Sequence, residues 1–216
     1  CEVCAVSLPD VQAALAKLLS SKPKLISLEP RTVNDVWEDI QRVAEALSAP
    51  ERGITFVAQS QARMDAIRER AEQIDAKPTV ACIDWIDPLM AAGNWVPELV
   101  KMVGGQNLFG EVGEHSPWLD WKDLRQADPD IIVLMPCGFD LVRTVEEAAS
   151  LWSLEGWADL KAVQSKRLYA TDGNAYFNRP GPRLVDSMEI LAEIIHPGAF
   201  AFGYVGSGWV GLETAS

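Results

Sequence analysis

Basic residues are scarce in this sequence, and long apolar runs are absent. Lys and Arg total 19 against 31 Asp and Glu, so the formal net charge is −12, and such a negative field repels nucleic acid and anionic lipid. No run approaches the roughly 18 apolar residues of a membrane-spanning helix, and the amino end lacks the basic-then-apolar order of a signal peptide. We expect no nucleic-acid partner, and we expect any export signal to lie upstream of Cys1 or not to exist.

Cysteine is scarce too, with four residues in 216, which is too few for a disulfide scaffold in a chain of this length. Cys1 and Cys4 form a C-x-x-C, a spacing found in redox pairs and in half of a zinc site, but no second pair follows to complete four ligands. A structural or incidental role is therefore the favoured interpretation. A metal or redox enzyme that uses Cys1, Cys4 and Cys137 is the alternative.

Motifs for catalysis are missing. The two histidines, His115 and His196, lie far apart, and neither a P-loop, a nucleophile elbow nor a zinc-protease motif is present. Residues 206–211 match G-x-G-x-x-G, but too few residues follow them to form the helix that a dinucleotide site needs. Asp84 and Asp87 are interpreted as solvated loop acids. We predict no catalytic residue, no metal site and no enzymatic activity.

The residues that are present suit a well-packed α/β protein, because 48% of them are hydrophobic, enough for one large domain or two small lobes. Near-continuous apolar strands between amphipathic helices favour a mostly parallel sheet covered on both faces. Residues 197–216, with five glycines, are expected to form a tail or a packed loop. Periodicity predicts helices at 11–19, 33–47, 53–75, 96–103, 144–151 and 180–196, and strands at 24–28, 79–84, 130–135 and 167–171.

The helix at 53–75 would be unusually long, because no proline or further glycine interrupts it. At 1.5 Å per residue it would extend roughly 33 Å, about the width of a small domain. A narrow apolar stripe on a long charged helix suits a strut that joins two lobes, and an ordinary surface helix is the alternative. The stripe consists of Ile54, Val57, Met64, Ile67, Ala71 and Ile74.

Three loops that follow predicted strands share an unusual composition. Residues 85–98, 136–140 and 172–180 combine aromatic rings with Gly, Asn and Pro, a mixture that suits a planar, partly apolar ligand with polar edges. In parallel sheets, ligands bind outside the carboxyl ends of the strands. A buried ring taken alone is usually core, but three such loops at one sheet edge predict a ligand cleft.

Residues 92–100 with Gly104-Gly105, residues 136–140 and residues 172–183 together resemble the cobalamin-type branch of the ABC-transporter substrate-binding proteins, as do residues 1–6. The resemblance extends to about residue 197. It implies an α/β fold of two Rossmann-like lobes joined by one long helix, like class III periplasmic binding proteins. It also implies capture of cobalamin, haem or a ferric siderophore between the lobes, in the periplasm or another extracytoplasmic location, for delivery to a membrane permease.

The family normally begins with most of a lobe before the residues that match Cys1, so the N-terminal lobe is expected to be incomplete. The domains implied are a remnant of this lobe at 1–50, the interlobe helix at 51–76, a C-terminal α/β lobe at 77–196 and a tail at 197–216. An incomplete lobe would expose apolar surface and a sheet edge, and such surfaces favour self-association.

The resemblance also assigns residues. Glu98 is the candidate acidic contact for permease arginines, and a plain acid at a helix start is the alternative. No cofactor is expected; the ligand is expected to be cobalamin or a similar metal chelate, bound without being transformed. The implied ligand-binding residues are Trp85, Gly93, Asn94, Trp95, Cys137, Gly138, Phe139, Asn174, Tyr176, Phe177 and Arg179.

Overall fold

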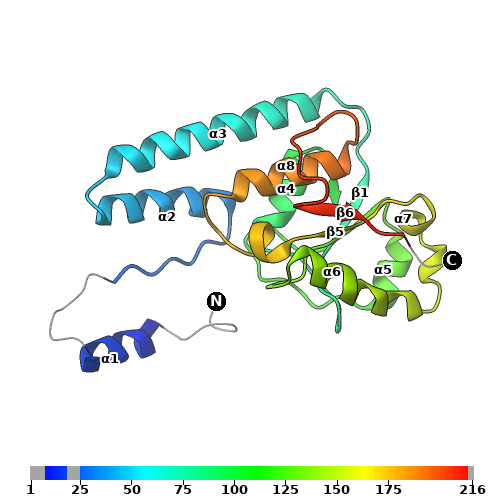
Figure 1. The fold of residues 1–216 in the computed structure, drawn as a ribbon, viewed down its shortest axis with the longest axis horizontal. Helices are drawn as coiled ribbons and strands as arrows, with labels where there is room; N and C mark the ends of the chain where they lie inside the picture. Colours follow the sequence, from blue (N-terminus) through cyan, green and yellow to red (C-terminus); the bar gives the residue numbers. More distant parts are fainter. Residues whose placement is uncertain (1–7, 19–24, 214–216) are drawn as a thin grey trace.

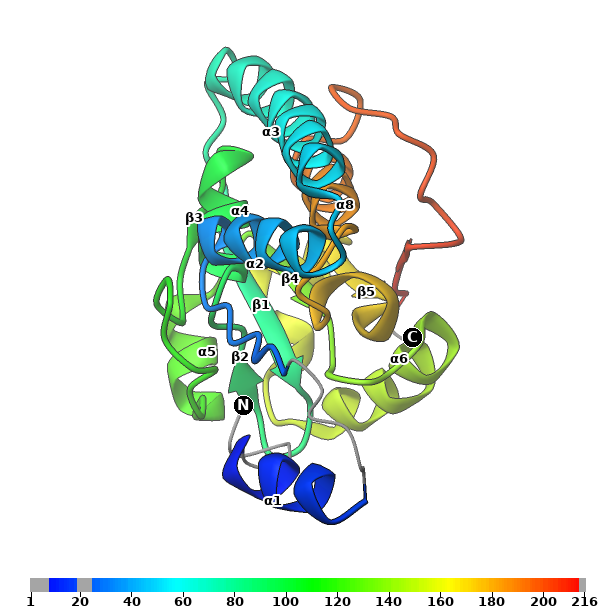
Figure 2. The ribbon, with the colours of Figure 1, turned by 90° about the vertical axis from the view of Figure 1, so that its left-hand side faces the viewer.

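The computed structural model describes residues 8–18 and 25–213. Helix α1 (Leu8–Leu18) lies apart from the remaining elements, as Figures 1 and 2 both show. Residues 25–31 are extended but pair with no strand of the described chain, and Leu25 and Leu28 are 40% and 46% exposed. The predicted strand at 24–28 is therefore wrong for its described residues, because an apolar run becomes a strand only where a neighbouring strand edge accepts its backbone hydrogen bonds. Lys24 lies outside the described residues.

Two antiparallel helices follow (Figure 1), and both confirm the helices expected there. Helix α2 (Val33–Ala46) begins with a capping box, in which the Thr32 hydroxyl accepts from the Asp35 amide and the Asp35 carboxylate accepts from the Thr32 amide. Helix α3 (Pro50–Glu72) runs back along α2. Gly53 permits this close contact, since a Cβ there would lie 2.6 Å from Ala44 Cβ.

Helix α3 connects α2 to the rest of the molecule. One end packs on α2, and the other packs on α8 (Leu184–Ile195) and α4 (Val96–Met102). On its inner face Val57, Met64, Ile67 and Ala71 are buried, as predicted for the stripe. Its two end residues differ, because Ile54 is 52% exposed and Ile74 lies beyond the end of α3 and is half-buried. Arg63 of α3 forms ion pairs with Glu189 (2.7 Å) and Asp186 (3.2 Å) of α8.

The sheet is mostly parallel, which confirms the prediction. Strands β1, β4 and β5 run parallel, β3 pairs in parallel with the start of β1, and β2 and β6 are antiparallel to their neighbours. The spatial order is β2-β1-β4-β5-β6. The strands are β1 (Thr79–Trp85), β2 (Met90–Ala91), β3 (Gln106–Asn107), β4 (Ile131–Leu134), β5 (Leu168–Thr171) and β6 (Trp209–Gly211).

Both faces of the sheet are covered by helices. Val80, Cys82 and Val133 join a core with α2, α3, α4 and α8, while the alternate residues Ala81 and Leu134 join a core on the opposite face. The elements on that face are α5 (Trp121–Ala127), α6 (Leu141–Ala148) and α7 (Lys161–Gln164), with 3₁₀ turns at Ala149–Ser153 and Trp157–Asp159. None of the helices in the described ranges combines the length and apolarity needed to cross a membrane.

The segment after α8 is largely a packed loop, one of the two forms expected, and it ends in β6, an edge strand of the sheet that was not expected. The buried carboxylate of Glu193 holds the segment in place. Its oxygens accept hydrogen bonds from the amides of Phe202 and Gly203 and, at 2.7 Å, from Trp209 Nε1. Three N–H donors replace the water that burial removes from this charge.

Candidate functional site

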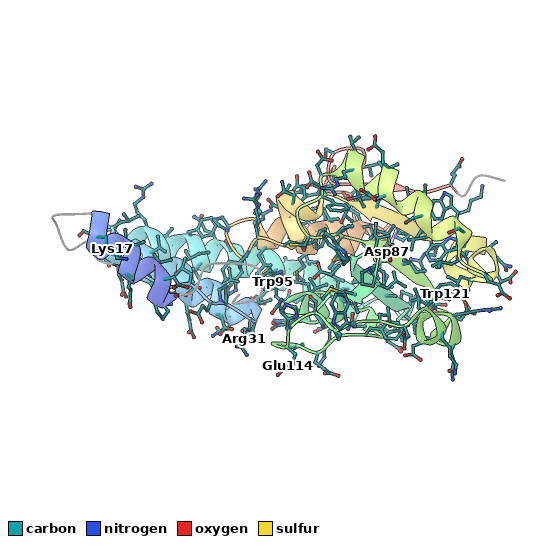
Figure 3. The ribbon with its side chains drawn as sticks, turned by 90° about the horizontal axis from the view of Figure 1, so that it is seen from below. Lys17, Arg31, Asp87, Trp95, Glu114 and Trp121 are labelled. Atoms are coloured by element: carbon teal, nitrogen blue, oxygen red, sulfur yellow. The ribbon has the colours of Figure 1, made fainter. Side chains whose placement is uncertain are left out.

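A cavity of about 770 Å³ opens at the carboxyl end of β1. It lies where the extended segment before α2 meets the loop at 110–118, beside Trp95, with Arg31 and Glu114 labelled nearby in Figure 3. Its walls come from the loops after β1, β4 and β5, as the sequence predicted for a ligand cleft. The cavity is lined by Leu28, Glu29, Pro30, Asp84, Trp85, Met90, Ala92, Gly93, Asn94, Trp95, Val96, His115, Ser116, Trp118, Cys137, Phe177, Asn178 and Pro180.

Trp85 forms one wall at the end of β1. Its indole Nε1 donates to the Asp87 carbonyl (3.0 Å), and its ring packs edge-on against Phe139 with centroids 5.2 Å apart. Phe139 is buried behind Trp85, with the Arg143 guanidinium 3.6 Å from its ring centroid, and does not line the cavity. Phe139 therefore supports the cavity wall from behind, a packing role that also suits an aromatic residue after a strand.

The turn at Gly93, Asn94 and Trp95 forms the next wall. A Cβ on Gly93 would lie 2.5 Å from the Glu114 carbonyl oxygen, so only glycine fits this contact with the facing loop. Asn94 adopts the left-handed conformation (φ 52°), and its amide donates to the same carbonyl at 2.7 Å. Trp95 donates from Nε1 to the Phe177 carbonyl (3.0 Å), which ties the first cavity loop to the third.

Asp84, the last residue but one of β1, also lines the cavity. Its Oδ2 accepts from the Ser116 hydroxyl at 2.6 Å; burial raises the pKa of this carboxyl, and the Ser116 hydrogen bond and nearby His115 oppose the increase. Because the His115 Nδ1 lies 3.0 Å from a carbonyl oxygen, that nitrogen carries the proton. The solvated-acid interpretation is thus wrong for Asp84 and correct for Asp87, which is exposed.

Five of the residues predicted to bind ligand lie outside the cavity lining: Phe139, described above, and Gly138, Asn174, Tyr176 and Arg179. Gly138 occupies an exposed turn with open space around it. Asn174 and Arg179 bond to each other, with Arg179 Nη2 2.7 Å from Asn174 Oδ1. Tyr176, in the π-helical turn η3 (Gly173–Phe177), packs edge-on against Tyr204 with centroids 5.7 Å apart. The third loop instead contributes Phe177 and the two residues beyond the turn, Asn178 and Pro180.

Several lining residues were not predicted, above all those of the loop at 113–118. This loop is held in place by β2, since the amides of Ala91 and Leu119 donate to the carbonyls of Pro117 and Leu89. Trp118 remains 69% exposed at the cavity. The run Gly-Glu-His-Ser-Pro-Trp combines turn formers with polar and aromatic side chains, and this density is the signal that could have identified the loop.

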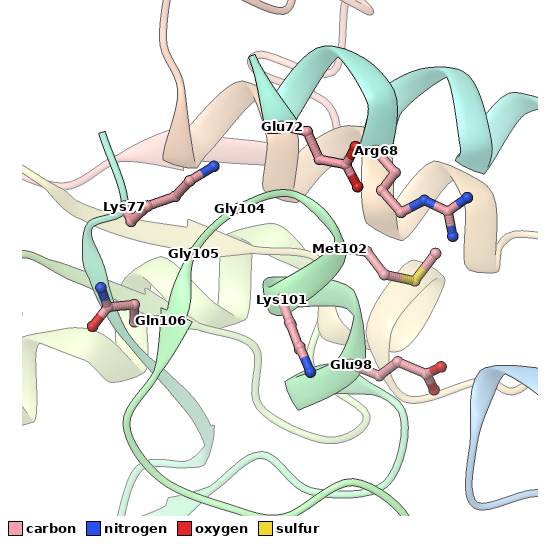
Figure 4. A pocket seen from close by; sticks show the side chains of 9 residues that line it. All are labelled: Arg68, Glu72, Lys77, Glu98, Lys101, Met102, Gly104, Gly105 and Gln106. Carbon is pink, nitrogen blue, oxygen red and sulfur yellow. The ribbon is translucent and has the colours of Figure 1, made fainter. Parts of the chain in front are cut away.

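Glu98 lies elsewhere, in a second groove of about 500 Å³ between α3, α4 and residues 104–106 (Figure 4). Its Oε2 accepts from the Val33 amide at 3.1 Å, so the carboxylate meets the positive end of α2. The groove also holds Arg68, Lys77 and Lys101. This position explains Glu98 structurally, and its contact with a permease stays a prediction.

The alternative of a metal or redox enzyme that uses Cys1, Cys4 and Cys137 has no support from the described residues. Cys1 and Cys4 lie outside them, and within 8–18 and 25–213 no three His, Cys, Asp or Glu side chains are grouped as metal ligands. Burial, with Asp84 nearby, raises the pKa of Cys82 to about 12, so this thiol stays protonated. Cys137 lines the cavity, and its amide donates to the Asp84 carbonyl at 3.0 Å.

Comparison with known proteins adds an independent observation. The sequence profile of the periplasmic binding protein family matches residues 5–175. YvrC of Bacillus subtilis, described as an uncharacterized ABC transporter substrate-binding lipoprotein, is 24% identical over 179 residues, 80% of this chain and 53% of that protein. The vitamin B12-binding protein of Vibrio cholerae is 23% identical over 188 residues, 81% of this chain and 60% of that protein.

Among solved structures, the periplasmic heme-binding protein RhuT from Roseiflexus sp. RS-1 matches with a TM-score of 0.71 and 24% identity. The match covers 89% of this chain and 73% of that one. It shows a shared fold, which confirms the α/β class expected from the sequence. The chain spans between half and two thirds of the length of the two curated relatives.

Proposed function

Because the chain belongs to the periplasmic binding protein family, we propose that it is the ligand-capturing part of an ABC importer's substrate-binding component. Its ligand is cobalamin or a related metal chelate, as the name of the Vibrio cholerae relative suggests. The observation that carries the proposal is the cavity at the carboxyl edge of the sheet, where loops distant in the chain converge. Its volume of about 770 Å³ lies within the roughly 300–1,000 Å³ of small-molecule sites.

Capture follows from the chemistry of the walls. Trp85, Trp95 and Trp118 supply large apolar surfaces for one face of a flat ligand. Asn94 and Asn178 lie beside them and offer polar groups to the ligand's edge. The tight backbone contact at Gly93 keeps this wall preformed, so little ordering cost is added on binding. We propose no catalytic residue, and the ligand leaves the cavity unchanged.

A permease is the partner that this function requires, and Glu98 remains the candidate contact for it. An extracytoplasmic location accords with the family and with the lipoprotein description of the Bacillus subtilis relative. Self-association through the amino-terminal region is also proposed, since Leu28 and Ile54 are about half exposed there.

Tryptophan fluorescence tests the proposal, because three indole rings line the cavity. The chain is titrated with cyanocobalamin, haemin and a ferric siderophore, and saturable quenching by one of them is expected. Trp118→Ala should weaken that binding, because it removes an aromatic surface from the cavity wall. Trp118 is exposed, so its loss should leave the fold intact. Trp152→Ala is the matched control. Trp152 lies outside the cavity lining and packs on the sheet face covered by α5, α6 and α7, so its loss should leave binding unchanged. If none of the three chelates quenches to saturation, the proposed function is wrong.

A further inference from the structure

The charged side chains that line the cavity in the described chain are mainly acidic. Two carboxylates line it, those of Asp84 and Glu29, together with the imidazole of His115. Among the described residues, no Lys or Arg lines it. Arg179, the only cation among the predicted ligand-binding residues, is outside the lining and donates to Asn174. The whole chain adds a net charge of −12, so no Lys or Arg of the described lining offsets the charge of a negatively charged ligand.

Hydrogen-bond donors in the wall are largely used within the protein. The indoles of Trp85 and Trp95 donate to the carbonyls of Asp87 and Phe177, and Asn178 Nδ2 donates to the Met135 carbonyl. The backbone amides at the cavity are also spent: that of Gly93 donates to Ser116 Oγ, that of Asn94 to the Glu114 carbonyl and that of Cys137 to the Asp84 carbonyl. These donors are therefore already engaged within the protein, whereas the carboxylates of Asp84 and Glu29 offer acceptors to a ligand.

Asp84 is the best placed of these acceptors. It is half-buried at the end of β1, where the rigid sheet fixes its backbone. Ser116 donates to Oδ2 and orients the carboxylate, while Oδ1 has no hydrogen-bond partner among the described residues. A carboxylate held in this way in a partly desolvated wall accepts strongly from an N–H or O–H donor and repels another carboxylate.

We propose that Asp84 determines which chelate the cavity accepts, and that this chelate has an uncharged edge rich in N–H or O–H donors. A chelate fringed by carboxylates is rejected, because its charges meet Asp84 and Glu29 with no cation between them. This inference rests on the proposed function and narrows it to one chemical class. Discrimination of this kind works by repelling the wrong ligand as well as by binding the right one.

Two corrin probes that share one ring isolate the effect of edge charge. Dicyanocobyrinic acid carries carboxylates around the ring, and its heptaamide carries amides at the same positions. Both are titrated into the wild-type chain by tryptophan quenching at neutral pH. We expect the heptaamide to bind about 100-fold more tightly than the acid, as expected for a like-charge contact that costs several kcal/mol. Raising the salt concentration should reduce this ratio.

Asp84→Asn tests the assigned residue with nearly unchanged shape, and Asp87→Asn is the matched control. Asp87 lies three residues further along, in the turn after β1, and its substitution removes the same charge, but it is exposed and outside the cavity lining. Asp84→Asn should reduce the affinity ratio of the heptaamide to the acid about tenfold, mainly through tighter binding of the acid. Asp87→Asn should leave this ratio unchanged. Unfolding midpoints verify that both variants fold.

The possible outcomes separate this inference from the function on which it rests. Equal or tighter binding of the acid by the wild-type chain overturns the inference while leaving chelate capture intact, and this comparison needs no variant. If the affinity ratio of the heptaamide to the acid changes equally in Asp84→Asn and Asp87→Asn, Asp84 does not determine the choice of chelate. If neither corrin binds, the proposed function fails and the inference fails with it.

Discussion

Substituting Gly93 with alanine tests the architecture of the cavity wall. The added Cβ would lie 2.5 Å from the Glu114 carbonyl oxygen, 2.7 Å from the Ser116 nitrogen and 2.8 Å from the His115 carbonyl carbon. All three are backbone atoms, and the closest is about 1 Å inside the ordinary contact distance of ~3.5 Å. The loop must therefore move, because no side chain can rotate away.

The expected cost follows from this geometry. Overpacking of a close contact costs about 1–3 kcal/mol, and displacing the loop also disrupts the hydrogen bond from the Gly93 amide to Ser116 Oγ, worth about 1 kcal/mol. Gly93→Ala should thus lower the free energy of unfolding by about 2–4 kcal/mol. Chelate binding should weaken as well, because Ser116 orients Asp84 and moves with the loop.

Urea unfolding followed by fluorescence measures the first effect, and chelate titration measures the second. Gly181→Ala is the control, since a Cβ at Gly181 would meet nothing within 4 Å and its φ lies outside the left-handed region. This variant should be neutral or slightly stabilising, through lower entropy of the unfolded chain. If Gly93→Ala matches Gly181→Ala in stability and affinity, the wall is not built by this contact.

Three further predictions concern the cavity ring Trp118, the carboxylate of Glu193 and the imidazole of His196. Trp118→Ala should weaken chelate binding by about 1–3 kcal/mol with an unchanged unfolding midpoint, and unchanged affinity would remove this ring from the site. Glu193→Gln should destabilise the segment at 200–211, because one of its three N–H donors must lose its acceptor. Hydrogen exchange should then accelerate at β6, and unaltered protection would contradict that role. Burial lowers the pKa of His196 despite its bond to the Val103 carbonyl, so the unfolded chain binds a proton more readily. Stability should therefore decline as pH falls below the unfolded value of about 6.5, and His196→Gln should flatten this dependence in urea titrations at several pH values.

Elements that bury one continuous stripe were predictable. The strands at 79–84 and 130–135 and the long helix α3 were found within a few residues, since their apolar periods match the backbone geometry. The short strands β2, β3 and β6 were not found. Each has two or three residues, too few for a period, and each forms because a longer strand offers it an edge.

The residues at strand ends were also predictable as a site, because parallel strands deliver the loops that follow them to one edge. Trp85, Asn94 and Trp95 line the cavity for this reason. Which rings turn inward was not predictable: Phe139 packs behind Trp85, and Tyr176 packs against Tyr204. Both choices depend on neighbours more than 25 residues away in the chain.

Periodicity and family motifs thus sufficed for the α/β class, the long connecting helix and the location of the cavity, because these follow from local geometry and from strand direction. Folding in three dimensions decided the chemistry of its walls. It brought Ser116 and His115 to Asp84, left Arg179 outside the lining and added residues 28–30 to the cavity wall. A carboxylate's environment is the sum of contacts from separate segments, so only their packing together establishes it.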